Sequence, residues 1–493
     1  MTDWLLRGGE VVDGRGGPRR RADVAITGDR VAAVGAIARA AGAREIDLAG
    51  KIVAPGFIDV HTHDDRALFA TPDMAAKASQ GVTTVVTGNC GVSLAPLVLA
   101  AAPPPPLDLI GDTDDYHYQR FADYLAALDR ASPALNAACL VGHSTLRVEA
   151  MTALDRPAEK AELGQMGGRL QEALDAGAVG LSSGLAYAPA SHAPASEIEA
   201  LAALLRPAGA LYTTHMRNEG DAVVASLEES FAAGRAAGVP VVISHHKTVG
   251  CENFGRTAET LPLLAAAIAR QEVGLDAYPY VASSTVLNAA QAARALKVLV
   301  TWSKSAPEQA GRELSAIAAD WGVSEQEAAV RLQPAGAVYW MMDEADVQRV
   351  LQFAYTMIGS DGLPHDTHPH PRLWGAFPRV LGYYSRELGL FSLEEAVRRM
   401  TGLSAYRFGL AGRGVLEPGA YADVTVFDPE TVADRATFEM PTTPAAGIEH
   451  VFVNGRPVWT DGKPTGERPG RALRRQQLQA EARHIAGFAG KTG

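Results

Sequence analysis

The sequence predicts an α/β fold in which eight parallel strands, each followed by a helix, close into a (β/α)8 barrel of the TIM type. Eight runs of β-branched or apolar residues alternate with helix-length segments over about 300 residues. No glycine-rich dinucleotide fingerprint follows any of these runs, which disfavours an open doubly wound sheet. Histidine, cysteine and aspartate residues end several runs, as expected for a site at the carboxyl-terminal mouth of a barrel.

Before the barrel, the chain has the pattern of a small all-β unit. A Gly28-Asp29 turn between two short β runs is a typical hairpin signal, and a similar pattern with an Asn454-Gly455 turn returns near the other end. Neither stretch alone would make a stable sheet. We therefore expect one small β-sandwich domain built from residues 1–55 and 413–470. Its main predicted strands are 23–27, 30–34, 51–53, 422–427 and 450–458.

The barrel is expected to occupy residues 56–412. Its predicted strands are 57–61, 82–87, 136–141, 178–182, 211–215, 240–245, 273–278 and 356–360. Helical patterns connect them, for example at 158–176, 195–205, 219–237 and 257–271.

Two connections in this region are irregular. Residues 100–115, with four consecutive prolines and an acidic run, form a loop after the second strand. The connection over about 281–355 is far longer than most βα loops. An insertion on this face can act as a lid over the site, although a fixed structural element is the alternative. The insertion contains helix-like segments at 306–320, 323–332 and 343–354. Separately, the C-terminal tail 471–493 has the pattern of a polar helix.

Composition restricts the partners and the compartment. The formal net charge of −11 argues against a nucleic-acid or anionic-membrane partner, so a small-molecule substrate is expected. Three cysteines form no disulfide framework and fit a reducing compartment. The N-terminus lacks a basic and apolar leader, and no stretch reaches the about 18 apolar residues of a membrane span. We expect a cytoplasmic protein; the composition is compatible with a monomer but does not fix the oligomeric state.

The first candidate metal ligands lie on the first two barrel strands. His61 and His63 are two residues apart on a strand, so their side chains point to the same face. Cys90 follows the second strand, and its thiolate would favour zinc over magnesium or calcium. A nucleophilic cysteine is the rival interpretation of Cys90, but it needs a histidine base and no metal.

Further candidates end the later strands. His215 closes the fifth strand, whereas His245 and His246 both end the sixth. Adjacent strand residues face opposite ways, so only one of this pair should enter the barrel, and the pattern does not choose between them. Asp361 follows the eighth strand, where a carboxylate could take a proton from water and pass it to a leaving amine. The alternative for Asp361 is an ordinary Asp-Gly turn.

Two cations lie just beyond strand ends. Lys247 follows the sixth strand and Arg372 follows the eighth, where they could anchor an anionic substrate, although a surface position is the alternative for both. Three histidines in a proline-broken loop are not expected to be ligands: His365, His368 and His370.

At this point the chain resembles the amidohydrolase superfamily and, within it, the D-aminoacylase (N-acyl-D-amino-acid deacylase) family. The resemblance runs through nearly the whole chain and is weakest within about 286–300. The matching segments are 53–65 (VAPGFIDVHTHDD), 80–91 (QGVTTVVTGNCG), 142–147 (GHSTLR), 214–217 (THMR), 244–247 (SHHK), 276–280 (DAYPY) and 358–365 (IGSDGLPH).

The resemblance implies a metal-dependent hydrolase barrel that cleaves N-acyl-D-amino acids. It implies one tightly held zinc on Cys90, His215 and His245, and a second, weaker metal position that involves His61 and His63. It thereby favours His245 over its neighbour.

The resemblance also implies the remaining roles. Asp361 would be the general base and then the general acid, and the long insertion would be a lid. The α-carboxylate of the substrate would be held by Lys247, Tyr278 and Arg372.

One absence narrows the choice within the superfamily. Many binuclear amidohydrolases bridge their metals with a carboxylated lysine on the fourth strand, but residues 178–184 (AVGLSSG) contain no lysine. This argues against a dihydroorotase- or hydantoinase-type cyclic amidase. A metal-dependent deaminase and a non-catalytic, assembly-forming relative remain as alternatives, and the preferred side chain and acyl length are not fixed.

Overall fold

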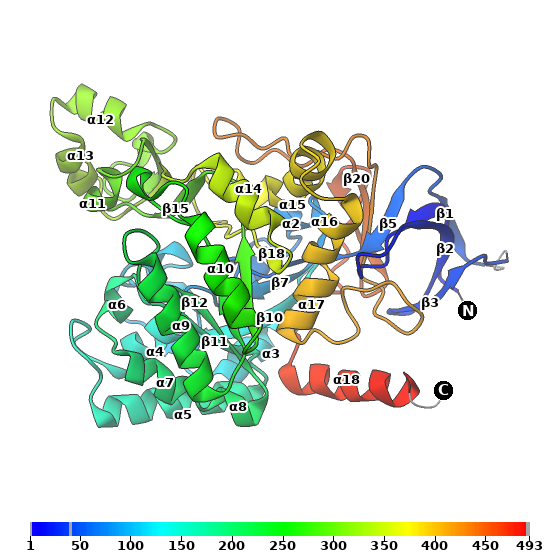
Figure 1. The fold of residues 1–493 in the computed structure, drawn as a ribbon, viewed down its shortest axis with the longest axis horizontal. Coiled ribbons are helices and arrows are strands. Elements are labelled where there is room, and N and C mark those ends of the chain that lie inside the picture. The colour runs from blue at the N-terminus through cyan, green and yellow to red at the C-terminus, as the bar shows by residue number, and fades with distance from the viewer. Residues whose placement is uncertain (1, 39–41, 490–493) are drawn as a thin grey trace.

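The computed structural model describes residues 2–38 and 42–489 (Figure 1). The predicted eight-stranded parallel barrel is confirmed. A parallel bridge between Thr62 and Gly362 joins its last strand to its first, and the Asp361 amide donates to the His61 carbonyl over 2.7 Å at the same seam. The barrel strands in order are β6 (Phe57–Asp59), β7 (Val82–Thr87), β10 (Asn136–Gly142), β11 (Gly180–Gly184), β12 (Leu211–His215), β13 (Val241–Ile243), β14 (Val273–Ala277) and β18 (Thr356–Ile358).

The barrel strands are buried on both faces, which explains their nearly continuous apolar sequences. In β10, Ala138 and Leu140 join one buried cluster together with Met357 of β18. The alternating residues Cys139 and Val141 belong to the larger cluster that includes the surrounding helices. This period of two is the alternation expected of a strand between a barrel interior and its helical ring.

The helices around the barrel largely follow the predictions. The predicted helix 195–205 ends earlier, because Pro207 cannot continue the ladder and would clash with the carbonyl four residues before it. The predicted helices correspond to α5 (Lys160–Ala176), α7 (Ala195–Ala202) with α8 (Leu205–Ala208), α9 (Val223–Ala237), α10 (Thr257–Ile268) and the tail helix α18 (Arg475–Ala489). Other helices are α1 (Ala67–Ala70), α2 (Ala75–Ala78), α3 (Phe121–Ala131), α4 (His143–Ala150), α6 (Ala188–Ser191), α15 (Arg372–Arg379), the π-helix η5 (Val380–Glu387), α16 (Leu393–Met400) and α17 (Gly402–Phe408).

Strands from both ends of the chain share one mixed sheet beside the barrel (Figure 1). The junction is β5 (Ile52–Pro55), which pairs in parallel with β1 (Trp4–Val11) and antiparallel with β19 (Val424–Phe427). The predicted association of strands from both termini is thus confirmed, and these strands form one nine-stranded mixed sheet. The domain limits at 55 and 413 stay a prediction. The remaining strands are β2 (Arg20–Thr27), β3 (Arg30–Gly35), β4 (Arg44–Asp47), β20 (Ile448–Val453), β21 (Arg456–Thr460) and β22 (Lys463–Pro464).

The long insertion contains a small antiparallel sheet that the sequence pattern did not predict. Its strands are β15 (Ala282–Val286), β17 (Ala335–Trp340) and β16 (Lys297–Ser303), in that spatial order. The three expected helical pieces are present as α12 (Leu314–Trp321), α13 (Glu325–Arg331) and α14 (Glu344–Gln352), and a short α11 (Ala289–Ala292) is added. Helices α11 to α13 project at one corner of the molecule (Figure 1) and pack on this sheet around their own apolar cluster.

The loop after the second barrel strand is irregular, as expected. It contains the short strand pair β8 (Leu97–Val98) and β9 (His117–Tyr118) and two 3-10 turns, η1 (Leu107–Leu109) and η2 (Thr113–Asp115). Further 3-10 turns are η3 (Cys251–Asn253) and η4 (Pro307–Gln309). Within the described part of the chain, no helix is long and apolar enough to cross a membrane.

Candidate metal centre

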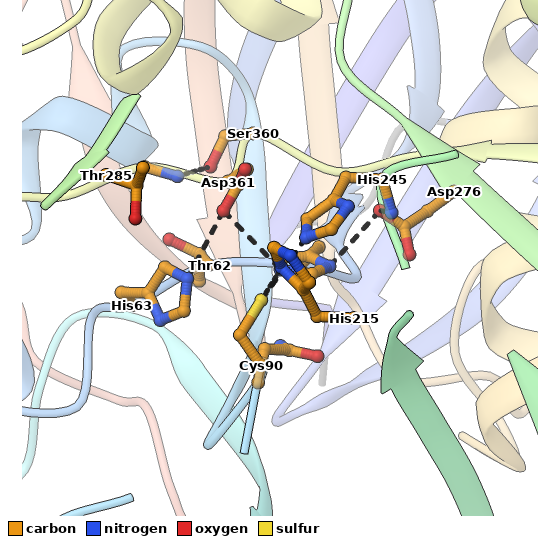
Figure 2. A network of polar contacts seen from close by, with 12 residues as sticks. Thr62, His63, Cys90, His215, His245, Asp276, Thr285, Ser360 and Asp361 are labelled. Atoms are coloured by element: carbon orange, nitrogen blue, oxygen red, sulfur yellow. Dashed lines mark hydrogen bonds and ion pairs between the residues drawn. The ribbon is translucent and has the colours of Figure 1, made fainter. Parts of the chain in front are cut away.

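Side chains from the ends of several barrel strands converge on one point (Figure 2). The Cys90 Sγ lies 3.2 Å from the His61 Nε2 and 3.4 Å from the His245 Nε2. The Asp361 Oδ1 lies 3.5 Å from the His61 Nε2 and 3.2 Å from the His63 Nε2. One donor atom from each of His61, Cys90, His245 and Asp361 lies within 4.8 Å of the others.

A second group of donors shares His245 with the first. It consists of His215, Glu219 and His245, again with their donor atoms within 4.8 Å of one another. The His215 and His245 ring centroids are 4.5 Å apart, and the His215 Nδ1 is buried without a hydrogen-bond partner. The five residues expected to ligate metal and Asp361 therefore meet in one place.

The structure distinguishes the two histidines that end the sixth strand. The His245 Nε2 points to Cys90, whereas the His246 Nε2 lies 2.8 Å from the Thr260 hydroxyl on α10. Burial away from the cluster lowers the pKa of His246 to about 4. His245 is therefore the residue of the pair that faces the centre.

Three residues of the centre have left-handed backbone conformations. The φ angles are +53° at Cys90, +37° at His245 and +50° at Asp361. Non-glycine residues rarely adopt this region, and each such residue costs about 1–3 kcal/mol. All three follow barrel strands, so the backbone turns where the side chain must enter the mouth. Strain at these positions is the pattern expected of a functional site.

The electrostatics of the centre favour a thiolate. Burial raises the pKa of Cys90, but the neighbouring His61 and His245 lower it, and the balance holds the pKa well below the usual thiol range. Asp276 supports the two histidines from behind: its Oδ1 lies 3.3 Å from the His61 Nδ1 and accepts a hydrogen bond from the His245 amide over 2.9 Å. Such outer partners fix the orientation of ligating histidines.

This donor set fits zinc. A tetrahedral site with ordinary Zn–S and Zn–N bonds places sulfur and nitrogen about 3.5 Å apart. The two sulfur–nitrogen separations at Cys90, 3.2 and 3.4 Å, are close to that value. Buried thiolate and imidazole donors are the ligands that zinc prefers.

The residues expected to hold a carboxylate also lie together. Arg372 is buried, with its Nη1 3.0 Å from the Asp361 Oδ2 and its Nη2 donating to the Ser284 carbonyl over 3.1 Å. The Tyr278 ring lies between two cations, 4.5 Å from the Arg372 guanidinium carbon and 5.7 Å from the Lys247 ammonium. Neither cation is a surface residue.

The centre opens into a cavity of about 550 Å³. Its floor includes His63, Cys90, His215, His245 and Asp361. One wall comes from β15 and α11 of the insertion, and another from the proline-rich loop with Pro105 and Pro106. The two irregular connections noted in the sequence therefore both border the site.

Two acidic residues of the site were missed by sequence reasoning. The Glu219 Oε1 lies 3.0 Å from the His245 Nδ1 and 2.8 Å from the Lys247 Nζ. Asp276 is the next-to-last residue of β14, so a search of the strand ends could have found it, whereas Glu219 lies four residues beyond β12 and gave no such signal. As expected, the three loop histidines belong to neither donor group among the described residues: His365, His368 and His370.

Comparisons with known proteins agree with this geometry. The sequence pattern of the amidohydrolase family matches residues 44–459. A D-aminoacylase of Alcaligenes xylosoxydans xylosoxydans is 57% identical over 473 residues, which cover 96% of this chain and 98% of the relative.

Two solved structures are similar over nearly their whole length. One is a D-aminoacylase with a binuclear metal centre, for which activation by one metal and attenuation by the second are described. It is 57% identical, with a TM-score of 0.94 over 96% of this chain and 100% of the other. The other is the N-acyl-D-glutamate deacylase of Bordetella bronchiseptica, solved with zinc and a phosphonate inhibitor that mimics the tetrahedral intermediate. It is 49% identical, with a TM-score of 0.93 over 96% of this chain and 99% of the other. The chain belongs to the amidohydrolase family.

Proposed function

We propose that this protein is a zinc-dependent N-acyl-D-amino-acid deacylase, which hydrolyses a linear amide to a D-amino acid and a carboxylic acid. The observation that carries the proposal is the position of Asp361 between two groups of side chains. Its Oδ1 lies 3.2 Å from the His63 Nε2, and its Oδ2 lies 3.0 Å from the Arg372 Nη1. One carboxylate thus adjoins both the metal-binding donors and the cation expected to hold the substrate.

The proposed tight zinc position uses Cys90, His215 and His245, and a second, weaker position involves His61 and His63. The Cys90 Sγ lies 3.4 Å from the His245 Nε2 and 3.2 Å from the His61 Nε2, so the thiolate adjoins both proposed positions. The division between them rests on the resemblance to the family. A bound zinc would polarise the amide carbonyl and acidify a water molecule.

Asp361 is the proposed general base and acid. Burial raises the pKa of Asp361, but Arg372 and the neighbouring histidines outweigh that effect and hold the pKa well below its usual range. The carboxylate is therefore ionised at neutral pH and can accept a proton from the attacking water. It can then donate that proton to the nitrogen of the leaving amine.

Chirality follows from three fixed points. Arg372, Tyr278 and Lys247 are proposed to hold the α-carboxylate, with the guanidinium supplying paired donors. The scissile carbonyl sits at the metal donors, and the side chain takes the remaining space of the cavity. An L-substrate held at the first two points would send its side chain elsewhere.

The insertion at about 281–355 is proposed as a lid. Ser283 and Ser284 of β15 line the cavity, and the Thr285 hydroxyl lies 3.1 Å from the Tyr187 hydroxyl across it. The negative charge and the three cysteines without disulfides support a cytoplasmic enzyme with a small-molecule substrate.

The test is hydrolysis of N-acetyl-D-methionine against N-acetyl-L-methionine by the zinc-loaded protein, with detection of the free amine. We expect cleavage of the D-form alone. Equal cleavage of both forms would overturn the chirality argument. Cleavage of neither, with N-acetyl-D-aspartate and N-acetyl-D-glutamate also uncleaved, would overturn the proposed function.

A further inference from the structure

A fully buried lysine lies below the mouth of the barrel, outside the cavity. Lys77 on α2 is 0% exposed, and its Nζ lies 2.7 Å from the Asp59 Oδ2 and 2.6 Å from the Ser360 hydroxyl. The Asp64 Oδ2 is 3.5 Å away. Burying an ammonium group is costly unless it is paired and hydrogen-bonded, so this arrangement demands a specific partner set.

Asp59 bonds to residues on both sides of the barrel seam, where the first strand, β6, meets the last strand, β18. Its Oδ1 accepts hydrogen bonds from the Ser360 amide over 2.8 Å and from the His61 amide over 3.3 Å. Its Oδ2 accepts from the Ser360 hydroxyl over 2.6 Å. One carboxylate, neutralised by Lys77, therefore holds both the backbone of His61 and the residue that precedes Asp361.

Asp361 needs such support because its backbone is left-handed, with φ +50°. Its amide donates to the His61 carbonyl over 2.7 Å, and the next amide, of Gly362, donates to the Ser360 hydroxyl over 3.1 Å. Ser360 and Asp361 are adjacent in Figure 2, with the Asp361 carboxylate directed to the histidines. The Ser360 hydroxyl thus links Lys77 to the turn that aims this carboxylate.

We infer that Lys77 is a positioning residue for Asp361: through Asp59 and Ser360 it fixes the left-handed turn that directs the carboxylate at the metal-binding histidines. The inference rests on the proposed function, since Asp361 is the base only in that reaction. Lys77, Asp59 and Ser360 are not among the residues that line the cavity, so they act without touching the substrate.

The first test is Lys77→Met, with Lys160→Met at an exposed position of α5 as the matched control. We expect the Lys77 variant to lower kcat for N-acetyl-D-methionine by about tenfold to a hundredfold, because a displacement near 1 Å costs rates of that order. KM and the zinc content should stay within about twofold, since the carboxylate clamp and the ligands are intact. An unchanged kcat would overturn the inference.

A double variant separates positioning from folding. Lys77→Met leaves the buried carboxylates of Asp59 and Asp64 without their cation, which lowers Tm. Adding Asp59→Asn removes one of these two charges and should restore part of the Tm. The kcat should stay low, because the Ser360 hydroxyl still lacks the Lys77 ammonium. Recovery of kcat together with Tm would show that Lys77 serves folding only and would overturn the inference.

Ser360→Ala provides a test if the lysine variant fails to fold. It removes one hydroxyl and no charge, so the protein should fold, and kcat should fall with KM unchanged; an unaltered kcat would contradict the inference. Activity of the wild-type protein distinguishes a failure of the proposed function from a failure of the inference about Lys77. If the wild type does not cleave the N-acetyl-D-amino acids, the proposed function is wrong. If the wild type cleaves them and the variants have the same kcat, only the role of Lys77 is wrong.

Discussion

The Arg372 guanidinium and the Asp361 carboxylate form a buried ion pair, with 3.0 Å between the Nη1 and the Oδ2. A pair removed from water is stable only when its remaining donors and acceptors are satisfied. Here the Nε of Arg372 makes no hydrogen bond within the described residues, although the whole side chain is buried. A substrate carboxylate would supply the acceptor that this donor lacks.

Replacing Arg372 by lysine should therefore weaken substrate binding. The planar guanidinium of Arg372 can contact Asp361, the Ser284 carbonyl and a substrate carboxylate at once, whereas the point-like ammonium of a lysine cannot. Loss of one charge-assisted contact, about 1.5–3 kcal/mol, corresponds to a KM increase of roughly tenfold to a hundredfold. Steady-state kinetics with N-acetyl-D-methionine measures it, with exposed Arg331→Lys as the control. An unaltered KM would remove Arg372 from the carboxylate site.

Asp361→Asn should abolish proton transfer while zinc stays bound. The amide cannot accept a proton at neutral pH, so kcat should fall by about 10²–10⁴-fold. Metal analysis of the purified variant should still find zinc, because the three proposed ligands remain. Loss of zinc would make Asp361 a ligand, and retained turnover would refute its role as base.

Cys90→Ser should lose both zinc and activity, because a serine hydroxyl is not deprotonated as this thiol is. Cys139→Ser is the matched control: Cys139 is also buried, but burial raises its pKa to about 12 and it belongs to neither donor group. A chelator should inactivate the wild-type protein, and added zinc should restore it. A Cys90 variant with full zinc content would contradict the ligand assignment.

The charge around the cavity predicts a preference for uncharged side chains. Apart from the two clamp cations, the described residues that line the cavity include Arg217 and Arg294. Each is already paired, Arg217 with Glu229 over 2.8 Å and Arg294 with Asp221 over 2.7 Å. An acidic side chain would find no free cation, so kcat/KM for N-acetyl-D-methionine should exceed that for N-acetyl-D-glutamate by about tenfold or more. The reverse order would refute this interpretation of the pocket.

Stability should fall at acidic pH through Glu197. Burial raises the pKa of Glu197, but hydrogen bonds from His143 and Arg147 lower it to about 2, below the 4.5 of an unfolded glutamate. A depressed folded pKa stabilises the protein fully above the unfolded value, and this stabilisation is lost as the pH falls from about 4.5 towards 2. Urea unfolding across this range should show a steeper loss in the wild type than in Glu197→Gln. Identical pH dependence would exclude Glu197 as a source.

The strand-end rule was enough to find most of the site from the sequence. His61, Cys90, His215 and Asp361 each follow a run that became a barrel strand, and parallel strands bring such ends to one mouth. The choice between His245 and His246 needed the register of a three-residue strand, which no local pattern fixes.

The insertion contains strands that the sequence pattern did not predict. Its helical pieces are local and were found, but β15, β16 and β17 gain their stability from pairing across up to 58 residues, with Ala282 opposite Trp340. Such strands are set by partners rather than by propensity.

The pairing of β5 with β19, which joins residue 52 to residue 427, also has a consequence for biosynthesis. The chain leaves the ribosome from its N-terminus, so β5 and the β6 strand that leads to His61 emerge long before the partner of β5 is made. Until then β5 presents an open strand edge, which is prone to wrong pairing. Contacts of such large sequence separation also form slowly. During synthesis, the barrel strands can therefore assemble first, and β5, which directly precedes β6, receives its partner β19 only after all the barrel strands have been made.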